Sequence, residues 1–257
     1  MESLKNKIVF ITGATSGIGR ACAVEFARGG ADLILCARRL EMLNTFAEEL
    51  KAQSGIKTFS FQLDVRNEKE VNSTIATLPE EWKNIDILIN NAGLARGLSK
   101  FYEDDTNNWE EMIDTNVKGL LYVTKAVATG MVERKKGHII NIGSIAGHEV
   151  YSKGGVYCGS KHAVAAITKS MRMDLIDQNI RVSTIEPGFV ETNFSIVRFH
   201  GDEEKAKNVY KGMDPLVAED IADTAVYIAT RPAHVNIAEI TILPARQATI
   251  AVIHRKD

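Results

Sequence analysis

The sequence predicts a single α/β domain built around a doubly wound, parallel β-sheet. Short apolar runs alternate along the chain with longer stretches of helical periodicity, and most of these runs are continuous in Ile, Val and Leu. Continuous apolar runs are typical of parallel strands that helices cover on both faces, and repeated β-α-β units join such strands. We expect seven strands in the order 3-2-1-4-5-6-7, with ligands bound beyond their carboxyl ends.

The elements follow from these runs in chain order. The predicted strands are Ile8–Thr12, Leu33–Ala37, Thr58–Gln62, Ile85–Asn90, His138–Ile142, Arg181–Ile185 and Glu239–Leu243. Helical patterns lie between them at 17–28, 40–53, 67–77, 108–133, 155–178, 203–211 and 218–230. The stretch 187–215 is the longest interruption and contains several Gly and Pro residues, so we expect a substrate lid at about 188–215.

Length and composition narrow the class of protein. The chain has 257 residues, and no low-complexity linker divides it, so a single domain over 1–257 is expected. The net charge of −2, without a basic stripe, gives no reason to expect a nucleic-acid partner. No apolar run approaches the ~18 residues of a transmembrane helix, and too few residues precede the first strand for a secretory signal peptide.

Cysteine and histidine usage gives no sign of disulfides or a metal. Cys22, Cys36 and Cys158 are widely spaced and odd in number, which fits a protein of the reducing cytoplasm. The six histidines form no His-Glu-x-x-His pattern or other ligand cluster, so we expect no catalytic metal.

A glycine-rich segment follows the first strand. It reads Thr12-Gly13-Ala14-Thr15-Ser16-Gly17-Ile18-Gly19. Its three glycines let the backbone turn sharply and approach a pyrophosphate, whose charge meets the free N–H groups of the next helix. Three glycines can also form an ordinary loop, but their place between a strand and a helix favours dinucleotide binding and a Rossmann-type sheet.

The end of the second strand favours NADP over NAD. An NAD enzyme usually places a carboxylate there to bind the ribose 2′-hydroxyl, whereas this chain has Arg38 and Arg39. Two arginines at a helix N-terminus oppose the positive end of its dipole. A 2′-phosphate would offset that cost, because Arg binds phosphate in a bidentate manner. The alternative is a solvated basic turn.

Tyr157 and Lys161 are spaced one helical turn apart, and Ser144 ends the strand-like run before them. A phenol has a pKa near ~10, and an ammonium within ~4–6 Å would stabilise its ionised form. Ser144 adds a hydroxyl that can hold a carbonyl or alcohol oxygen. Alone, a Tyr and a Lys at this spacing are also an ordinary surface pair.

Taken in order, these motifs resemble the short-chain dehydrogenase/reductase family from Lys7 to about Leu243. Further matches are Asp64-Val65, Asn90-Asn91-Ala92-Gly93, Asn116 and Pro187-Gly188. The resemblance implies that Asn116 distorts its helix and holds a water in a proton relay. It implies a catalytic set of Asn116, Ser144, Tyr157 and Lys161, with Tyr157 as proton donor or acceptor and Lys161 lowering its pKa.

The resemblance also completes the expected cofactor site. Asp64 would hydrogen-bond the adenine amino group, and Val65 would offer its backbone. The expected NADP(H) contacts are Gly13, Thr15, Ser16, Gly17, Ile18, Gly19, Arg38, Arg39, Asp64, Val65, Asn90, Ala92, Gly93, Tyr157, Lys161, Pro187, Gly188, Val190 and Thr192.

Segments of the second half are similar to the 3-hydroxy acid dehydrogenases within that family, in particular 137–144, 185–188 and 194–202. That similarity implies oxidation of the 3-hydroxyl of a small acid (serine, allo-threonine, 3-hydroxypropionate or 3-hydroxyisobutyrate type), or the reverse reduction. Expected substrate contacts are Ser144, Tyr157 and Arg198, the arginine as the carboxylate clamp. Arg96 and His148 are alternative anchors, and Arg198 could instead form a loop-closing or subunit-interface salt bridge.

Other functions remain open. A larger ketone or a 3-oxoacyl thioester is an alternative substrate for the same chemistry. A non-catalytic NADP-binding regulator is a further alternative, disfavoured by the intact catalytic set. The family resemblance also suggests a homotetramer.

Overall fold

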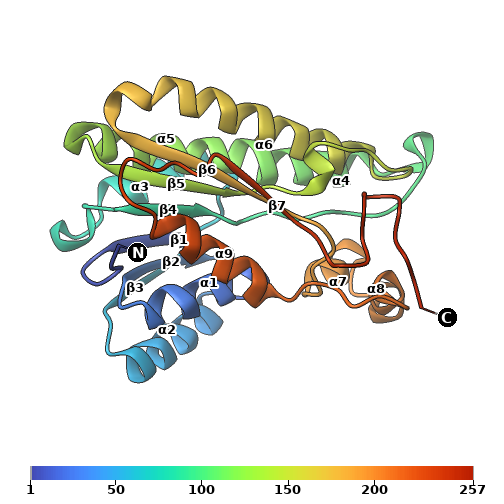
Figure 1. Cartoon of the computed structure of the whole chain (residues 1–257), viewed down its shortest axis with the longest axis horizontal. Helices are drawn as coiled ribbons and strands as arrows, with labels where there is room; N and C mark the ends of the chain where they lie inside the picture. The colour runs from blue at the N-terminus through green and yellow to red at the C-terminus, as the bar shows by residue number, and fades with distance from the viewer. Residues whose placement is uncertain (1, 257) are drawn as a thin grey trace.

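A seven-stranded sheet forms the centre of the molecule, as seen in a computed structural model that describes residues 2–256 (Figure 1). The strands are β1 Ile8–Thr12, β2 Asp32–Ala37, β3 Thr58–Gln62, β4 Ile87–Asn90, β5 Gly137–Ile142, β6 Ile180–Pro187 and β7 Glu239–Ile242. Their order is β3-β2-β1-β4-β5-β6-β7, and every neighbouring pair is parallel. The predicted order is therefore confirmed, and the strand ends differ from the prediction by at most two residues.

The helices lie between the strands along the chain. They are α1 Gly17–Arg28, α2 Leu40–Ser54, α3 Glu68–Ala76, α4 Thr106–Ile113, α5 Leu120–Arg134, α6 Gly155–Asp174, α7 Phe194–Arg198, α8 Glu203–Tyr210 and α9 Ala218–Ala229. Short 3-10 turns occupy η1 Glu80–Trp82, η2 Phe101–Glu103, η4 Ile145–Gly147 and η5 Ile176–Gln178. Two predictions need correction: α7 was not foreseen, and the single helix expected over 108–133 is interrupted by a π-helical segment, η3 Asp114–Gly119.

Helices cover both faces of the sheet, which explains the continuous apolar strands. In Figure 1, α1, α2 and α9 lie below the sheet, and α3, α5 and α6 lie above it. Because side chains alternate along a strand, β1 sends Val9 and Ile11 into the lower core and Phe10 into the upper one. All three side chains are fully buried. Full burial of such a side chain contributes about 1.5–3 kcal/mol, so each strand ties the two layers together.

The carboxyl ends of the strands meet at one edge of the sheet. Asn90 at the end of β4 is in register with Asn141 of β5, and Ile142 of β5 with Ile185 of β6. The loops that leave these strands therefore emerge side by side, as expected for a doubly wound sheet.

A pair of helices lies between β6 and α9, within the segment expected to form a lid. Ser195 of α7 and Tyr210 of α8 share a hydrogen bond of 2.7 Å between their hydroxyl oxygens. The Tyr210 hydroxyl also donates to the carbonyl oxygen of Val190 at 2.9 Å. These contacts join α7, α8 and the loop after β6 into one unit beside the strand edge (Figure 1).

Candidate active site

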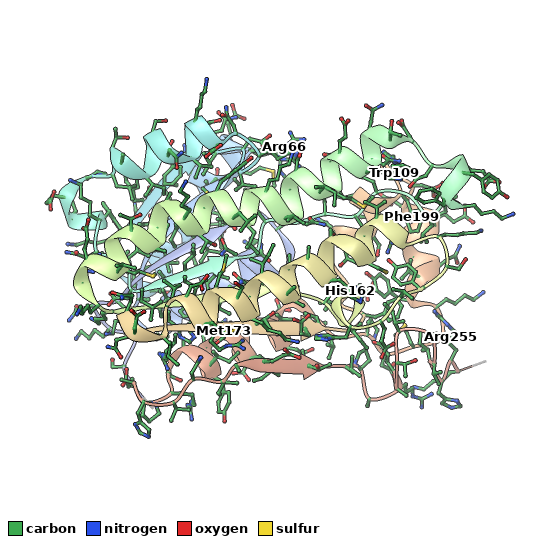
Figure 2. All side chains as sticks on the ribbon, turned by 90° about the horizontal axis from the view of Figure 1, so that it is seen from above. Arg66, Trp109, His162, Met173, Phe199 and Arg255 are labelled. Atoms are coloured by element: carbon green, nitrogen blue, oxygen red, sulfur yellow. The ribbon has the colours of Figure 1, made fainter. Side chains whose placement is uncertain are left out.

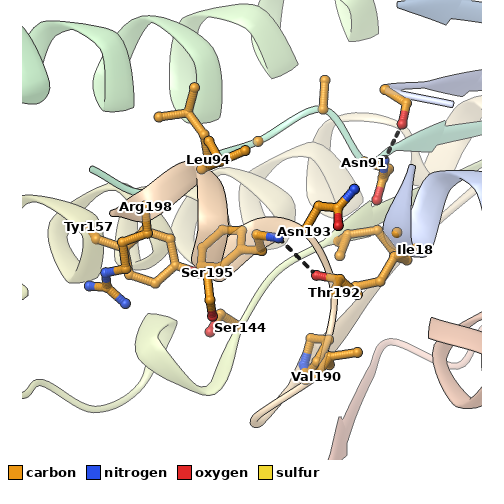
Figure 3. Close-up of a pocket in the computed structure, with 18 of the residues that line it drawn as sticks. Ile18, Asn91, Leu94, Ser144, Tyr157, Val190, Thr192, Asn193, Ser195 and Arg198 are labelled. Carbon is orange, nitrogen blue, oxygen red and sulfur yellow. Dashed lines mark hydrogen bonds between the residues drawn. The ribbon is translucent and has the colours of Figure 1, made fainter. Parts of the chain in front are cut away.

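A cleft of about 1080 Å³ opens at the carboxyl edge of the sheet. Its walls are the loops after β1 to β6, the first turns of α1 and α6, and helix α7 (Figure 3). Most of the predicted site residues line it: Gly13, Thr15, Ser16, Gly17, Ile18, Arg38, Arg39, Asp64, Val65, Ala92, Gly93, Ser144, Tyr157, Lys161, Pro187, Gly188, Val190, Thr192 and Arg198. Gly19, Asn90 and Asn116 lie outside this lining as formed by residues 2–256.

The turn between β1 and α1 has the shape that a phosphate cradle requires. Gly13 and Gly17 have φ angles of +69° and +55°, in the left-handed region that favours glycine. A Cβ atom at Gly17 would lie 3.3 Å from Cβ of Thr192, so glycine also permits the loop after β6 to approach. The side chain of the N-cap, Ser16, makes no capping hydrogen bond within the described chain. The first N–H groups of α1 therefore stay available to an anion.

Gly19 supports this turn by close packing. A Cβ atom there would lie 2.4 Å from Nδ2 of Asn91 and 2.5 Å from the carbonyl oxygen of Gly13. Nδ2 of Asn91 donates to the carbonyl oxygen of Thr12 at 2.9 Å, which ties the loop after β4 to the loop after β1. Asn91 lines the cleft although the sequence analysis did not select it.

The side chain of Asn90 lies in the core, where Nδ2 donates to Oγ1 of Thr124 at 2.8 Å and to Oδ1 of Asn141 at 2.9 Å. Asn90 belongs to the end of β4 and does not line the cleft formed by the described residues, so its predicted contact with the cofactor stays a prediction.

Basic side chains follow β2 at the adenosine end of the cleft. Nη2 of Arg39 donates to Oγ1 of Thr15 at 3.1 Å, and Nη1 of Arg38 lies 3.9 Å from Oε1 of Glu111. The Arg38 side chain is 56% exposed, so its guanidinium can reach a bound phosphate. The glycine turn and these two arginines fit an NADP molecule at its pyrophosphate and its 2′-phosphate.

Asp64 is already paired. Its carboxylate accepts from Nε and Nη2 of Arg66 at 2.9 and 2.6 Å, and this hydrogen-bonded pairing lowers the pKa of Asp64. The predicted hydrogen bond from an adenine amino group to Asp64 stays a prediction. The carboxylate has further lone pairs that Arg66 does not occupy, and these could accept that bond.

Asn116 lies in the π-helical segment between α4 and α5, as its expected distortion of the helix requires. Its Oδ1 accepts from the backbone N–H of Leu94 at 2.8 Å. Its Nδ2 donates to the Leu94 carbonyl oxygen at 2.8 Å and to Oγ of Ser160 at 3.0 Å. A Cβ atom at Gly93 would lie 3.2 Å from this amide oxygen. Asn116 therefore fixes the loop after β4 against α6, next to the cleft rather than in its wall.

Tyr157 and Lys161 project from the first turns of α6, and both are 8% exposed. Burial lowers the pKa of Lys161 to about 8, and its Nζ donates to the carbonyl oxygen of Ile142 at 2.9 Å. Burial likewise raises the pKa of Tyr157, with a smaller opposing effect from a hydrogen bond with Ser144 and from the charge of Arg198.

The predicted effect of Lys161 on the pKa of Tyr157 stays a prediction. In this arrangement burial is the largest influence on that pKa and raises it. The Lys161 ammonium binds a strand carbonyl oxygen, while the phenol is enclosed by apolar and aromatic side chains.

Ser144 stands where β5 passes into η4. Its Oγ accepts from the backbone N–H of Ala146 at 3.1 Å, and its own N–H donates to Oε2 of Glu186 at 2.5 Å. These contacts hold Ser144 in the wall of the cleft (Figure 3).

Arg198 enters the cleft from α7. Its guanidinium carbon lies 5.4 Å from the ring centres of both Tyr157 and Tyr151. Its Nε donates to the carbonyl oxygen of Gly97 at 3.1 Å, and Nη2 donates to the Tyr151 hydroxyl. Figure 3 places the guanidinium beside the Tyr157 ring.

The two alternative anchors are engaged elsewhere. Nε of Arg96 lies 2.6 Å from Oε2 of Glu111, and Nη1 donates to the carbonyl oxygen of Val197 at 2.7 Å. Nε2 of His148 faces Glu239 at 3.4 Å and Glu186 at 3.7 Å. Within the described chain, neither side chain lines the cleft.

Sequence reasoning missed several wall residues. These are mainly Asn91, Tyr151, Phe189, Asn193, Phe194, Gln247 and Ile250. The Asn-Asn-Ala-Gly motif pointed to Asn91, whereas Tyr151 and the tail residues carry no local signal and reach the cleft only through the fold.

No helix within 2–256 is long and apolar enough to cross a membrane. The same residues contain no group of three His, Cys, Asp or Glu side chains placed to hold a metal ion.

This fold and site are those of a nicotinamide-dependent oxidoreductase, and comparison with known proteins gives the class. A short chain dehydrogenase family model matches residues 7–202, and the chain belongs to the short-chain dehydrogenase/reductase family. Its NADP dependence and its action on hydroxyl groups as a dehydrogenase follow from the relatives.

Three of these relatives are especially similar. The NADP-dependent 3-hydroxy acid dehydrogenase of Schizosaccharomyces pombe is 43% identical over 258 residues, which cover 100% of both chains. Sulfoacetaldehyde reductase 2 of Chromohalobacter salexigens is 44% identical over 97% of this chain and 99% of its own. A solved structure described as the closed form of serine dehydrogenase complexed with NADP+ is 45% identical, with a TM-score of 0.90, and covers 97% of this chain and 100% of its own.

Proposed function

We propose that this NADP-dependent dehydrogenase interconverts the 3-hydroxyl of a small 3-hydroxy acid and the corresponding 3-oxo acid. The observation that carries the proposal is a cation, Arg198, held in the cleft wall beside Tyr157. An anionic group on the substrate would bind that guanidinium and bring a neighbouring oxygen to the phenol. The relatives support this substrate class, since the names of two of them denote small molecules that combine an acid group with a hydroxyl or aldehyde.

The proton chemistry rests on side chains of α6 and β5. When bound, NADPH supplies the hydride that reduces the carbonyl carbon. Tyr157 donates a proton to the carbonyl oxygen, and its phenolate takes that proton back in the oxidising direction. Ser144 holds the same oxygen through its hydroxyl, because both residues line the cleft. Lys161 contributes positive charge beside the phenolate, and Asn116 keeps α6 in register with the loop after β4.

The burial of Tyr157 explains why its neighbours are needed for the proposed chemistry. Burial opposes formation of a phenolate, so oxidation requires charges and donors that offset that cost. Ser144 and Arg198 act in the favourable direction, and both face the cleft. In this proposal, Arg198 therefore has two functions: it anchors the substrate acid and stabilises the ionised form of Tyr157.

A cofactor-linked absorbance screen tests the proposal. The panel is serine, allo-threonine, 3-hydroxyisobutyrate, 3-hydroxypropionate and simple alcohols and ketones, with NADP and NAD in parallel. The proposal predicts the largest kcat/KM for one of the hydroxy acids with NADP. Turnover confined to large ketones or 3-oxoacyl thioesters would show that the substrate is not a small 3-hydroxy acid. Cofactor binding without turnover on an extended carbonyl panel would indicate a non-catalytic regulator.

Assembly and compartment belong to the same proposal. Apolar side chains stand exposed along α5, α6 and the turn after it: Leu121 at 37%, Met173 at 71% and Ile176 at 74%. Figure 2 labels Met173 near the end of α6. Such exposure favours burial against further copies of the chain, in a homotetramer. The three free thiols of Cys22, Cys36 and Cys158 favour the cytoplasm. Light scattering on the purified protein measures the number of subunits.

A further inference from the structure

A buried glutamate lies behind the catalytic serine, and neither the motifs nor the proposed chemistry gives it a role. Glu186, near the end of β6, is 0% exposed. Its Oε2 accepts from the backbone N–H of Ser144 at 2.5 Å, and its Oε1 accepts from Oγ1 of Thr184 at 2.8 Å. Burying a carboxylate is costly unless donors satisfy it, so this residue requires an explanation.

The backbone before Ser144 is shaped around the carboxylate. A Cβ atom at Gly143 would lie 2.3 Å from Oε2 of Glu186 and 2.6 Å from its Oε1. Gly143 therefore packs directly on the carboxylate, and its own N–H donates to the carbonyl oxygen of Ile185 at 2.8 Å. The preceding residue, Ile142, is the one whose carbonyl oxygen accepts from Lys161. Glu186, the serine and the lysine thus belong to one compact cluster.

The charges around Glu186 come from three elements. Lys161 of α6 and His148 after η4 both favour its ionised form, against burial, which raises its pKa. Glu239 of β7 faces His148 from the other side, and Lys169 of α6 lies 3.9 Å from Glu239. In the opposite direction, the negative charge of Glu186 raises the pKa of Lys161 and so limits the effect of burial on that ammonium.

Hydrogen bonding alone does not account for a glutamate here. A glutamine has the same shape and could accept from the Ser144 N–H without the cost of a buried charge. What only the carboxylate offers is an acceptor on both oxygens and a negative charge. That charge packs on Gly143, the residue after the one whose carbonyl oxygen binds Lys161.

We propose that Glu186 is a positioning residue for Ser144 and Lys161. Its carboxylate fixes the backbone of Ser144, and its charge keeps Lys161 protonated at the pH of turnover. The inference rests on the proposed roles of Tyr157 and Lys161. The two contributions are separable, because a substitution can remove the charge while leaving the shape.

The test is the pH profile of kcat in the reducing direction, measured on the full chain with NADPH for wild type and Glu186→Gln. Loss of the neighbouring negative charge makes the ammonium of Lys161 less stable, so its pKa falls. In wild type, kcat should fall at alkaline pH as Lys161 loses its proton; this fall is the alkaline limb of the profile. We expect the limb to begin about one pH unit lower in Glu186→Gln, while NADPH affinity stays within about twofold. The matched control is Glu239→Gln, which removes the other carboxylate facing His148 and should leave the limb in place.

An unshifted limb in Glu186→Gln would overturn the proposal, and so would an equal shift in Glu239→Gln. Should Glu186→Gln fail to fold, Glu186→Asp carries the test. The shorter aspartate keeps the negative charge but moves the carboxylate away from the Ser144 N–H. We therefore expect kcat to fall roughly tenfold, while the alkaline limb of the pH profile stays at its wild-type position. Wild-type kcat in Glu186→Asp would overturn the positioning role.

Lys161→Met separates this inference from the proposed function. It should abolish turnover whatever the outcome for Glu186. Turnover retained in Lys161→Met would contradict the proposed function itself, whereas an inactive Lys161→Met with an unshifted Glu186→Gln would reject only the role of Glu186.

Discussion

The guanidinium carbon of Arg198 lies over the phenol ring of Tyr157 in the cleft, 5.4 Å from the ring centre. Arg198 comes from the short helix α7 in the lid and Tyr157 from α6 at the strand edge. Any substrate oxygen that bonds to the phenol is therefore close to a cation carried by the lid. A small acid is the kind of molecule that uses both.

Arg198→Ala should raise KM for 3-hydroxy acids roughly 10- to 100-fold, because a hydrogen bond to a charged group contributes about 1.5–3 kcal/mol. KM for neutral alcohols should change much less. Arg96→Ala is the matched control, since Arg96 binds Glu111 and lies outside the cleft wall that the described residues form. Equal losses on acids and neutral alcohols would reject the clamp.

Arg38→Ala should raise KM for NADPH roughly tenfold while that for NADH changes little, because only NADPH carries the 2′-phosphate. Steady-state kinetics with both cofactors measures the difference. Arg28→Ala, at the far end of α1 where Arg28 pairs with Glu25, serves as the control. An equal rise in KM for NADH would show that Arg38 does not bind the 2′-phosphate.

The pH dependence follows from the pKa of Lys161. Because burial lowers that pKa to about 8, Lys161 loses its proton as the pH rises through this value. The positive charge beside the phenol then disappears, so kcat/KM should decline above about pH 8 in the reducing direction. Lys161→Arg keeps a guanidinium that stays protonated, so any remaining activity should lose this alkaline limb. A wild-type profile that stays flat to about pH 10 would contradict the assignment.

Asn116→Ala should destabilise the protein and slow turnover. The substitution leaves the N–H and the carbonyl oxygen of Leu94 without their partner, at about 1–3 kcal/mol for each buried group left unpaired. Urea denaturation measures the loss in the free energy of unfolding. Asn107→Ala, on the exposed first turn of α4, is the control and should change it by less than about 0.5 kcal/mol. Unchanged stability in Asn116→Ala would remove the structural role described here.

Much of the fold could be predicted because the local composition of a segment indicates whether it forms a buried strand. The runs that formed β1 and β3 were placed with both ends correct: β1 is an apolar run that ends before Gly13, and β3 alternates Phe with polar residues. The break between α4 and α5 could not be placed, because the π-helical segment has only six residues and is too short to show a period of its own in the sequence. Helix α7 is shorter than two turns and leaves no periodic signal.

The site was predictable where motifs fix the backbone and less so where side-chain direction matters. The glycine turn, Ser144, Tyr157 and Lys161 all line the cleft. The sequence does not show that the amide of Asn90 binds Thr124 and Asn141, because both partners come from other elements of the fold. The direction of the Tyr157 pKa shift depends on how completely its surroundings exclude water, and that is set by distant segments such as Phe194.

Tyr157→Phe tests the central claim most directly, with turnover measured by NADPH absorbance and NADPH affinity by fluorescence titration on the same preparation. The phenylalanine keeps the ring beside Arg198 but removes the proton that the phenol donates. Turnover should fall by about 100-fold or more while NADPH affinity stays nearly intact. Wild-type turnover in Tyr157→Phe would contradict the account.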